Sequence, residues 1–201
     1  FQRSYFDSIS LFTPDAKRAL YQPALAREVG GIDSFAVAAR PWFDEAAHLD
    51  RINQALYLDM QLLLSGNNLV KPDRMAVSIE ARTPFLDWRM MEFAFRSRGA
   101  TKLSGGDKKH WYKKAAAPLI GDDLAYRRKQ MFTVPIGEWF RAGSYPWLRD
   151  TLADSGLLRQ HFNAAAVDGM LARHRDGSAN FTRELRALAA LALWHRASEM
   201  G

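Results

Sequence analysis

The side chains best suited to chemistry in this sequence are charged groups placed where one predicted helix stops and another starts. The segment 69–87 ends in the run E-A-R-T-P-F-L-D, which occupies positions 80–87. Pro84 disfavours helix at the residue before it, and Asp87 is suited to cap a new helix. Glu80 and Arg82 would therefore flank a sharp corner. They could form an ion pair that locks the corner, or they could contribute polar groups to a substrate pocket.

Two basic segments follow this corner. The first, Asp107–Lys114, reads D-K-K-H-W-Y-K-K and predicts a cationic helix start. The second, at positions 127–139, reads R-R-K-Q-M-F-T-V-P-I-G-E-W and predicts a basic loop that enters a helix at Pro135. Fixed positive charge in a cleft stabilises negative charge that develops on phosphate or acyl oxygens. The two segments therefore favour chemistry on an anionic substrate, although each could also be a solvated basic surface.

In their order and spacing, these three segments resemble the carboxy-terminal part of the synthetase domain of glutamine-hydrolysing asparagine synthetases. In that family a helix ending in E-x-R-x-P-F-L-D precedes a G-x-x-K helix and then R-R-K-Q-x-F-x-V-P. The likeness is clearest from Tyr57 to Phe140. The segment Tyr5–Leu25 also resembles the linker and helix of the family.

The resemblance implies roles for individual side chains. Lys109 matches the active-site lysine of the family and is the predicted catalytic residue. Arg128 and Lys129 match basic residues that would bind the nucleotide or its pyrophosphate. The positions that match the substrate pocket are Lys71, Asp73, Arg74, Glu80 and Arg82.

The resemblance also implies a reaction. The side-chain carboxylate of aspartate attacks the α-phosphate of ATP, which forms an acyl-adenylate and releases pyrophosphate. Ammonia derived from glutamine then displaces AMP and leaves an amide. ATP and Mg²⁺ are the expected cofactors of the intact enzyme. Two alternatives stay open: a related amidotransferase that acts on another acceptor, such as a surface-polysaccharide sugar acid, and a helical binding module without catalysis.

Hydrophobic spacing predicts helices along almost the whole chain, and no stretch alternates with a period of two residues. We therefore predict an all-α chain. The resemblance places it as the helical portion of an α/β synthetase domain of the adenine-nucleotide alpha-hydrolase type, with a family-like part at about 1–142 and a helical extension at about 143–201. The predicted helices cover about 14–29, 44–64, 68–79, 88–98, 107–116, 122–127, 135–141, 163–174 and 180–194.

The phosphate-gripping loop of such domains, the PP-loop S-G-G-x-D-S, has only a near match here. Ser104-Gly105-Gly106-Asp107 lacks a preceding hydrophobic strand, and Lys108 stands where the motif requires an aspartate. We interpret this run as a turn and N-cap before a helix that starts at Lys108. The PP-loop and the glutaminase domain, with its cysteine nucleophile, are therefore expected upstream in a longer protein. This chain alone is expected to be inactive and to bind no cofactor.

Composition limits the remaining possibilities. A chain of 201 residues with 48% hydrophobic residues can bury a core, and the absence of cysteine excludes disulfides and thiolate chemistry within it. The histidines are scattered, so we expect no metal site made by the chain itself. The sequence has no long apolar run and no secretory signal pattern, and we expect a cytoplasmic protein with no membrane partner.

The net charge of +6 is concentrated in the second half of the chain, where the stretch 102–129 carries eight basic residues. Such a patch attracts polyphosphates and nucleic acids alike. The aromatic residues between these charges are better explained as core anchors than as platforms for bases, so nucleic acid is the less favoured partner. The expected partners are small-molecule substrates and an amino-terminal glutaminase domain of the same protein.

Overall fold

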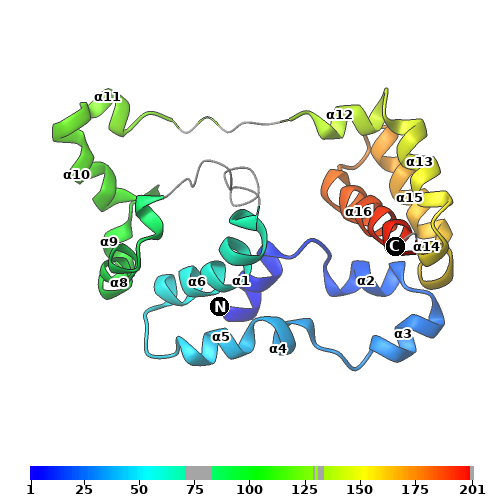
Figure 1. Cartoon of the computed structure of the whole chain (residues 1–201), viewed down its shortest axis with the longest axis horizontal. Coiled ribbons are helices and arrows are strands. Elements are labelled where there is room, and N and C mark those ends of the chain that lie inside the picture. The colour runs from blue at the N-terminus through cyan, green and yellow to red at the C-terminus, as the bar shows by residue number, and fades with distance from the viewer. Residues whose placement is uncertain (71–82, 129, 131–133, 200–201) are drawn as a thin grey trace. The chain divides into compact units, whose positions relative to one another are not determined.

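The computed structural model describes residues 1–70, 83–128, 130 and 134–199. The chain divides into two compact units, each built from two separate stretches (Figure 1). Unit 1 consists of Phe1–Phe6 and Asp33–Gln130, and unit 2 consists of Asp7–Ile32 and Met131–Gly201.

Unit 1 is mainly helical and contains one pair of short strands. Its earlier elements are α1 (Gln2–Ile9), which begins in this unit, α4 (Ser34–Ala38), α5 (Arg40–Glu45), α6 (Arg51–Asp59) and the π-helix η1 (Met60–Asn68). Its later elements are the 3₁₀-helix η2 (Pro84–Leu86), α8 (Trp88–Arg96), α9 (Gly99–Lys102), β1 (Leu103–Ser104), β2 (Asp107–Lys108), α10 (His110–Ile120) and α11 (Asp122–Ala125).

The buried apolar side chains of unit 1 lie on α4, on α6 and along α5. The single helix predicted over 44–64 is wrong, because α5 ends at Glu45 and Asp50 starts α6 by accepting hydrogen bonds from the backbone N–H groups of Ile52 and Asn53. The predicted cap at Asp87 is confirmed, since its carboxylate accepts from the N–H of Arg89 at the start of α8. The buried apolar residues are Phe35, Ala39, Phe43, Ala46 and Leu58.

The glycine pair before the basic segment forms a hairpin turn. Gly105 and Gly106 both have positive φ, 55° and 86°, which a two-residue hairpin loop of type I′ requires at its two central positions. The register pairs Leu103 with Lys108 and Ser104 with Asp107. The predicted turn is therefore confirmed, but the predicted N-cap and helix start at Lys108 are wrong. The described residues are mostly helical, and this two-stranded sheet departs from the predicted all-α chain.

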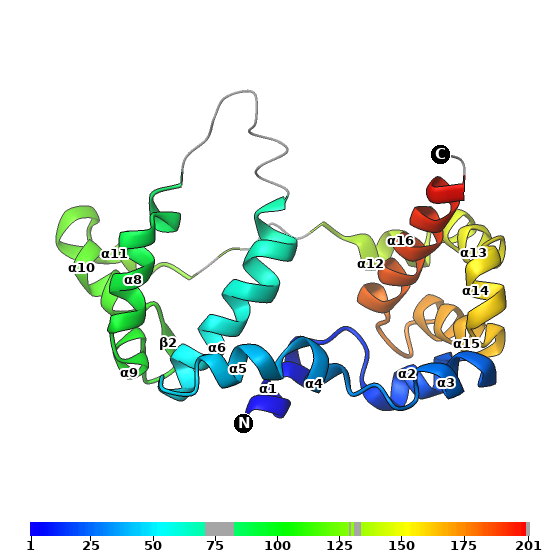
Figure 2. The same ribbon diagram turned by 60° about the horizontal axis from the view of Figure 1, so that its bottom comes forward.

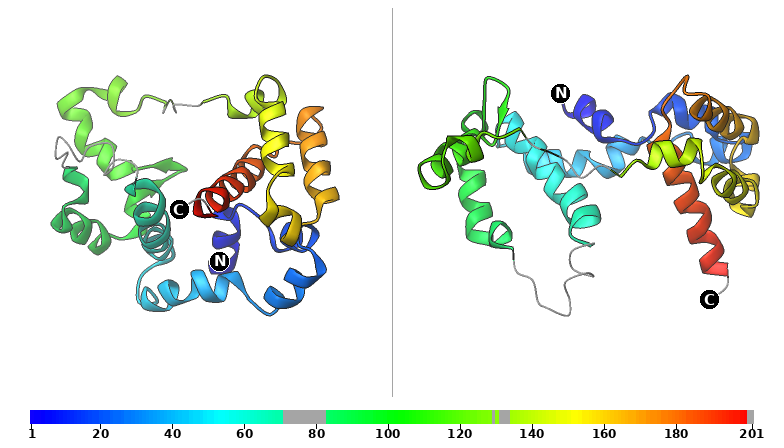
Figure 3. Two further views of the ribbon diagram at one scale, coloured as in Figure 1. Left: turned by 45° about the vertical axis from the view of Figure 1, so that its right-hand side comes forward. Right: turned by 90° about the horizontal axis from the view of Figure 1, so that it is seen from above.

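Unit 2 is helical in its described part, and α16 packs against α13, α14 and α15 (Figure 3). The helix predicted over 14–29 is wrong, because extended backbone at Tyr21 and Gln22 divides it before Pro23. Tyr21 instead forms an antiparallel bridge with Phe162. The elements are α2 (Pro14–Leu20), α3 (Pro23–Val29), α12 (Ile136–Arg141), α13 (Tyr145–Ala153), α14 (Gly156–His161), α15 (Ala164–Arg175) and α16 (Thr182–Glu199).

A continuous apolar cluster holds unit 2 together. Leu148 and Leu185 are fully buried in this cluster. Its other members, from α2 and α12–α16, are five further leucines, one phenylalanine, one valine and two alanines. Side-chain caps at Thr13 and Asn163 set the starts of α2 and α15, close to the predicted helix starts at 14 and 163. Burial of such side chains contributes about 1.5–3 kcal/mol each, so this cluster is the main source of stability in unit 2.

The helix predicted over 68–79 lies largely outside the described residues, and the division near residue 142 stays a prediction. No described helix combines the length and the apolar character needed to cross a membrane.

Candidate functional site

The backbone of Lys109 has an unusual conformation. Its φ and ψ are 62° and 31°, and it is the one non-glycine residue with positive φ among those that the structure describes. This left-handed region costs an ordinary L-residue about 1–2 kcal/mol, because Cβ approaches the following carbonyl. Residues held in such conformations concentrate at functional sites. The strained backbone is that of the residue to which the family resemblance assigns a catalytic role.

Lys109 occupies the N-cap position of α10. Its carbonyl accepts the first helical hydrogen bond from the N–H of Lys113, at 3.0 Å, and no side chain caps this helix end. The N–H groups of the first turn lack intrahelical acceptors, and the helix dipole adds partial positive charge there. An exposed ammonium on Lys109 and free amides on α10 thus meet at one end of one helix. This arrangement suits a phosphate or carboxylate ligand.

An ion pair joins the hairpin to α10 beside this helix end. The Lys113 ammonium, which is half-buried, contacts the carboxylate of Asp107 on β2. This contact lowers the pKa of the Asp107 carboxyl, and it outweighs the burial that would raise that pKa. Nδ1 of His110 lies 3.8 Å from the second carboxylate oxygen. Lys113 therefore holds the hairpin in place and is not a free surface cation.

Of the other predicted site residues, Arg128 is the one that lies among the described residues. Arg128 is exposed in the segment that follows α11, also within unit 1. Within the described part of the chain, no hydrogen bond or ion pair joins it to Lys109. The remaining predicted residues lie outside the described residues, and these are Lys71, Asp73, Arg74, Glu80, Arg82 and Lys129.

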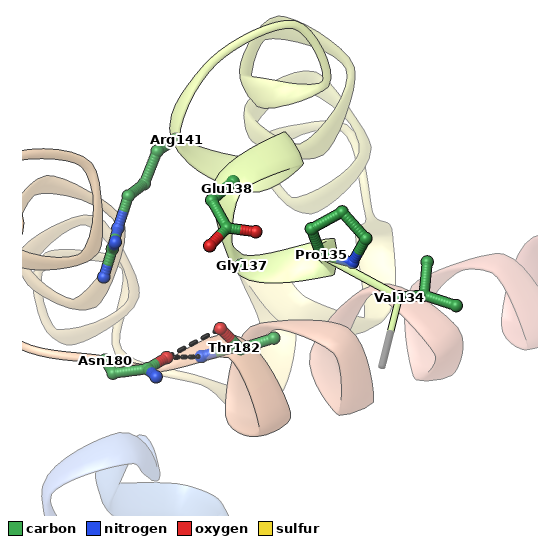
Figure 4. A pocket seen from close by; sticks show the side chains of 7 residues that line it. All are labelled: Val134, Pro135, Gly137, Glu138, Arg141, Asn180 and Thr182. Atoms are coloured by element: carbon green, nitrogen blue, oxygen red, sulfur yellow. Dashed lines mark hydrogen bonds between the residues drawn. The ribbon is translucent and has the colours of Figure 1, made fainter. Parts of the chain in front are cut away.

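A polar pocket of about 340 Å³ lies in unit 2, and its described lining contains none of the predicted site residues. Glu138 and Arg141 on α12 face Asn180 and Thr182 across it (Figure 4). The Asn180 side chain accepts hydrogen bonds from the backbone N–H and the hydroxyl of Thr182, at 3.1 and 2.6 Å, and so begins α16. The sequence predicts a helix that starts near Asn180, but it does not predict the pocket.

The buried residue His174 supports the pocket from α15. Its side chain is 1% exposed, and its Nδ1 accepts a hydrogen bond from the N–H of Phe181 at 3.2 Å. Nε2 therefore carries the proton and donates to the carbonyl of Gly137 at 3.1 Å. The carbonyl of His174 in turn accepts from Nε of Arg141 at 2.9 Å. His174 thus fixes α12 to α15, and it acts as a structural residue. Among the described residues, no group of three or more His, Asp or Glu side chains is placed to hold a metal ion.

A strained lysine at an uncapped, basic helix start is an arrangement suited to an anionic ligand. The family model described as asparagine synthase matches residues 5–196. The chain therefore belongs to the asparagine synthase family, and the resemblance drawn from its motifs is confirmed.

Two relatives show the extent of the match. The chain is 34% identical over 160 residues to "Putative asparagine synthetase (glutamine-hydrolyzing)" of Mycobacterium bovis, which covers 77% of this chain and 24% of the relative. It is 26% identical over 199 residues to "Asparagine synthetase (glutamine-hydrolyzing) 1" of Bacillus subtilis, covering 96% of this chain and 30% of the relative. The chain thus spans less than a third of the length of these relatives. No solved structure matches it.

Proposed function

We propose that this chain is the helical part of an ATP-dependent, glutamine-using amide ligase, with asparagine as the simplest product. Membership of the asparagine synthase family supports the class of reaction. The names of the two relatives support glutamine as the source of ammonia. The observation that carries the proposal at the level of residues is the left-handed backbone of Lys109 at the start of α10.

In this proposal the Lys109 ammonium stabilises negative charge that develops during acyl transfer. A carboxylate oxygen of aspartate bonds to the α-phosphorus of ATP, and pyrophosphate leaves with the electron pair of the broken P–O bond. Ammonia then bonds to the acyl carbon, AMP leaves, and a proton is lost from nitrogen. Both steps place charge on phosphate or acyl oxygens, which an ammonium and free backbone amides are suited to stabilise.

The other predicted residues take supporting roles in the same proposal. Arg128 and Lys129 would bind the pyrophosphate of ATP, whose Mg²⁺ accompanies it as part of the substrate. The pocket residues Lys71, Asp73, Arg74, Glu80 and Arg82 would border the acceptor. The PP-loop and a glutaminase domain would come from the part of the longer protein that these 201 residues do not include. A chain without the PP-loop should then bind Mg-ATP only through weak, salt-screened attraction.

The test is the substitution Lys109→Ala in the longer protein that carries this chain. We expect kcat for amide formation to fall about 100-fold, while KM for ATP changes far less, because the ammonium acts on charge present only in the transition state. Steady-state measurement of amide and AMP production gives both constants.

The matched control is Lys114→Ala. Lys114 is exposed on α10, five positions from Lys109, and carries the same charge, so it reports loss of the general positive field. Lys113 is unsuitable, because its ion pair with Asp107 holds the hairpin. Equal, small losses from Lys109→Ala and Lys114→Ala would contradict the catalytic role.

A further inference from the structure

A second set of polar contacts joins the start of α6 to the start of α9, two helices that lie side by side (Figure 2). The Asp50 carboxylate caps α6 through the N–H groups of Ile52 and Asn53, at 3.0 and 3.1 Å. The same carboxylate accepts a hydrogen bond from the N–H of Gly99 at 2.8 Å. A single side chain thus serves the first turns of two helices, although Asp50 and Gly99 are 49 residues apart in the sequence.

Asn53 extends these contacts to Lys102. The Asn53 side chain is buried, at 3% exposure, and its Nδ2 donates to Asp50 and to the carbonyl of Ser97, both at 2.9 Å. Its Oδ1 accepts a hydrogen bond from the ammonium of Lys102, the last residue of α9. That ammonium also lies 5.4 Å from the centre of the Phe95 ring. The buried amide is therefore fully used, and Lys102 supplies the donor that its oxygen needs.

We call these contacts between the starts of α6 and α9 the junction. Its packing leaves no room for a side chain at Gly99. A Cβ atom at Gly99 would stand 2.3 Å from Oδ1 of Asp50 and 2.4 Å from Cβ of Ile52. Burial alone would raise the pKa of Asp50, but the N–H groups of Gly99, Asn53 and Ile52 together hold it below its usual value. Burial lowers the pKa of Lys102, and the attraction of Asp50 opposes that change. At this junction the Asn53 amide bridges two closely packed charges, those of Asp50 and Lys102.

This junction lies immediately before the hairpin that leads to Lys109. Lys102 is followed directly by β1, then by the turn at Gly105 and Gly106, then by β2 and Lys109. The ion pair between Asp107 and Lys113 spans Lys109 and ties β2 to α10. The strained backbone therefore follows the Lys102 contact and lies between the two partners of this ion pair. A strained conformation persists only where its surroundings enforce it.

We infer that Lys102 is a positioning residue: its hydrogen bond to the buried Asn53 anchors the hairpin so that Lys109 keeps its left-handed backbone. The inference about catalysis rests on the proposed function, in which Lys109 acts on the substrate. The inference about structure does not, because the anchoring of the hairpin can be measured on these 201 residues alone.

The structural arm compares amide hydrogen exchange in the unmodified chain and in Lys102→Met, which keeps an unbranched stem over Phe95 but removes the donor. The N–H of Lys113, bonded to the carbonyl of Lys109, should exchange about tenfold faster in the variant. The N–H of Phe43 in α5 and that of Leu185 in unit 2 should keep their rates. Lys114→Met should change none of the three.

Two results of the structural arm would overturn the inference. One is unchanged exchange at Lys113, which would show that the hairpin does not depend on Lys102. The other is an equal acceleration at Lys113 and Phe43, which would show that Lys102 supports unit 1 as a whole and does not act on the hairpin in particular.

The catalytic arm is a double-mutant cycle in the longer protein. Lys102→Met should lower kcat about tenfold with little change in KM for ATP, and Lys102→Arg, which restores a donor, should recover most of the loss. In a Lys109→Ala background, Lys102→Met should cause no further loss, because its effect passes through Lys109. Independent, multiplying losses would overturn the positioning role. If Lys109→Ala alone is harmless, the proposed function fails, and the exchange result still decides the structural inference.

Discussion

Unit 2 and the later part of unit 1 bury their side chains in different ways. Unit 2 encloses a continuous cluster of leucines and other apolar residues, with Leu148 and Leu185 at 0% exposure. In the stretch 83–128 of unit 1, all of which the structure describes, Gly99 is the one buried residue. Large apolar side chains such as Trp88 and Leu119 are exposed there, at 69% and 84%.

The difference shows that these regions draw stability from different sources. Unit 2 depends on removal of apolar surface from water, which is large and non-directional. The stretch 83–128 depends on directional polar contacts and on aromatic pairs, such as Phe85 with Tyr112 and Phe93 with Trp111. Regions with few buried apolar contacts open locally at low cost in free energy. The candidate catalytic lysine thus lies in the region that we expect to be less stable.

The largest expected effect comes from a pair of matched leucine substitutions. Leu148→Ala removes a fully buried side chain from the cluster of unit 2 and should cost about 3 kcal/mol of unfolding free energy. Leu119→Ala removes the same atoms from an exposed position on α10 and should cost less than about 0.5 kcal/mol. Urea unfolding followed by circular dichroism measures both. Similar losses from the two variants would contradict the claim that the two regions draw their stability from different sources.

A smaller effect is expected at the junction in unit 1. Gly99→Ala forces a Cβ into Asp50 and Ile52 and should cost about 2 kcal/mol in the local stability of that unit. Gly66→Ala is the control, since nothing lies within 4 Å of a Cβ at that position in η1. Hydrogen exchange in α6 and α10 reports the change. If Ala were tolerated equally at both positions, the close packing at Gly99 would be contradicted.

The smallest effect concerns acid. The pKa of Asp50 is lower in the folded chain than its usual value of 3.8, so its stabilising contribution is complete above that value and is lost as the pH falls through the lowered pKa. Unit 1 should therefore lose stability progressively as the pH drops below about 4. Asp50→Asn should reduce this dependence on pH. An unchanged dependence in the variant would assign the acid sensitivity to other carboxylates.

Much of the helical content could be predicted from local sequence signals. Asp87 caps α8 as predicted, and Thr13 and Asn163 cap helices that start close to the predicted positions, because an N-cap depends on contacts within three residues. The hairpin was missed because a glycine pair before an aspartate fits an N-cap pattern as well as a type I′ turn. The division before Pro23 was missed because hydrophobic spacing continues across it.

The sequence predicts which lysine is the candidate catalytic residue, but it does not predict the backbone geometry of that residue. The family motif identifies Lys109, whereas no propensity favours a left-handed lysine, and surrounding contacts must impose that backbone. The hydrogen bond between Lys102 and Asn53 spans 49 positions and leaves no local signal in the sequence. The pocket beside Glu138 likewise depends on α12 meeting the start of α16, which only the tertiary fold reveals.

The central claim is that the backbone of Lys109 is strained so that its ammonium can act on the substrate. The most direct test measures stability and amide formation together in Lys109→Gly and Lys109→Ala, which lose the same ammonium. Glycine adopts positive φ without strain, so Lys109→Gly should be more stable than Lys109→Ala by about 1 kcal/mol, and both variants should lose amide formation about equally. Greater stability of Lys109→Ala, or near-normal amide formation in either variant, would contradict the account.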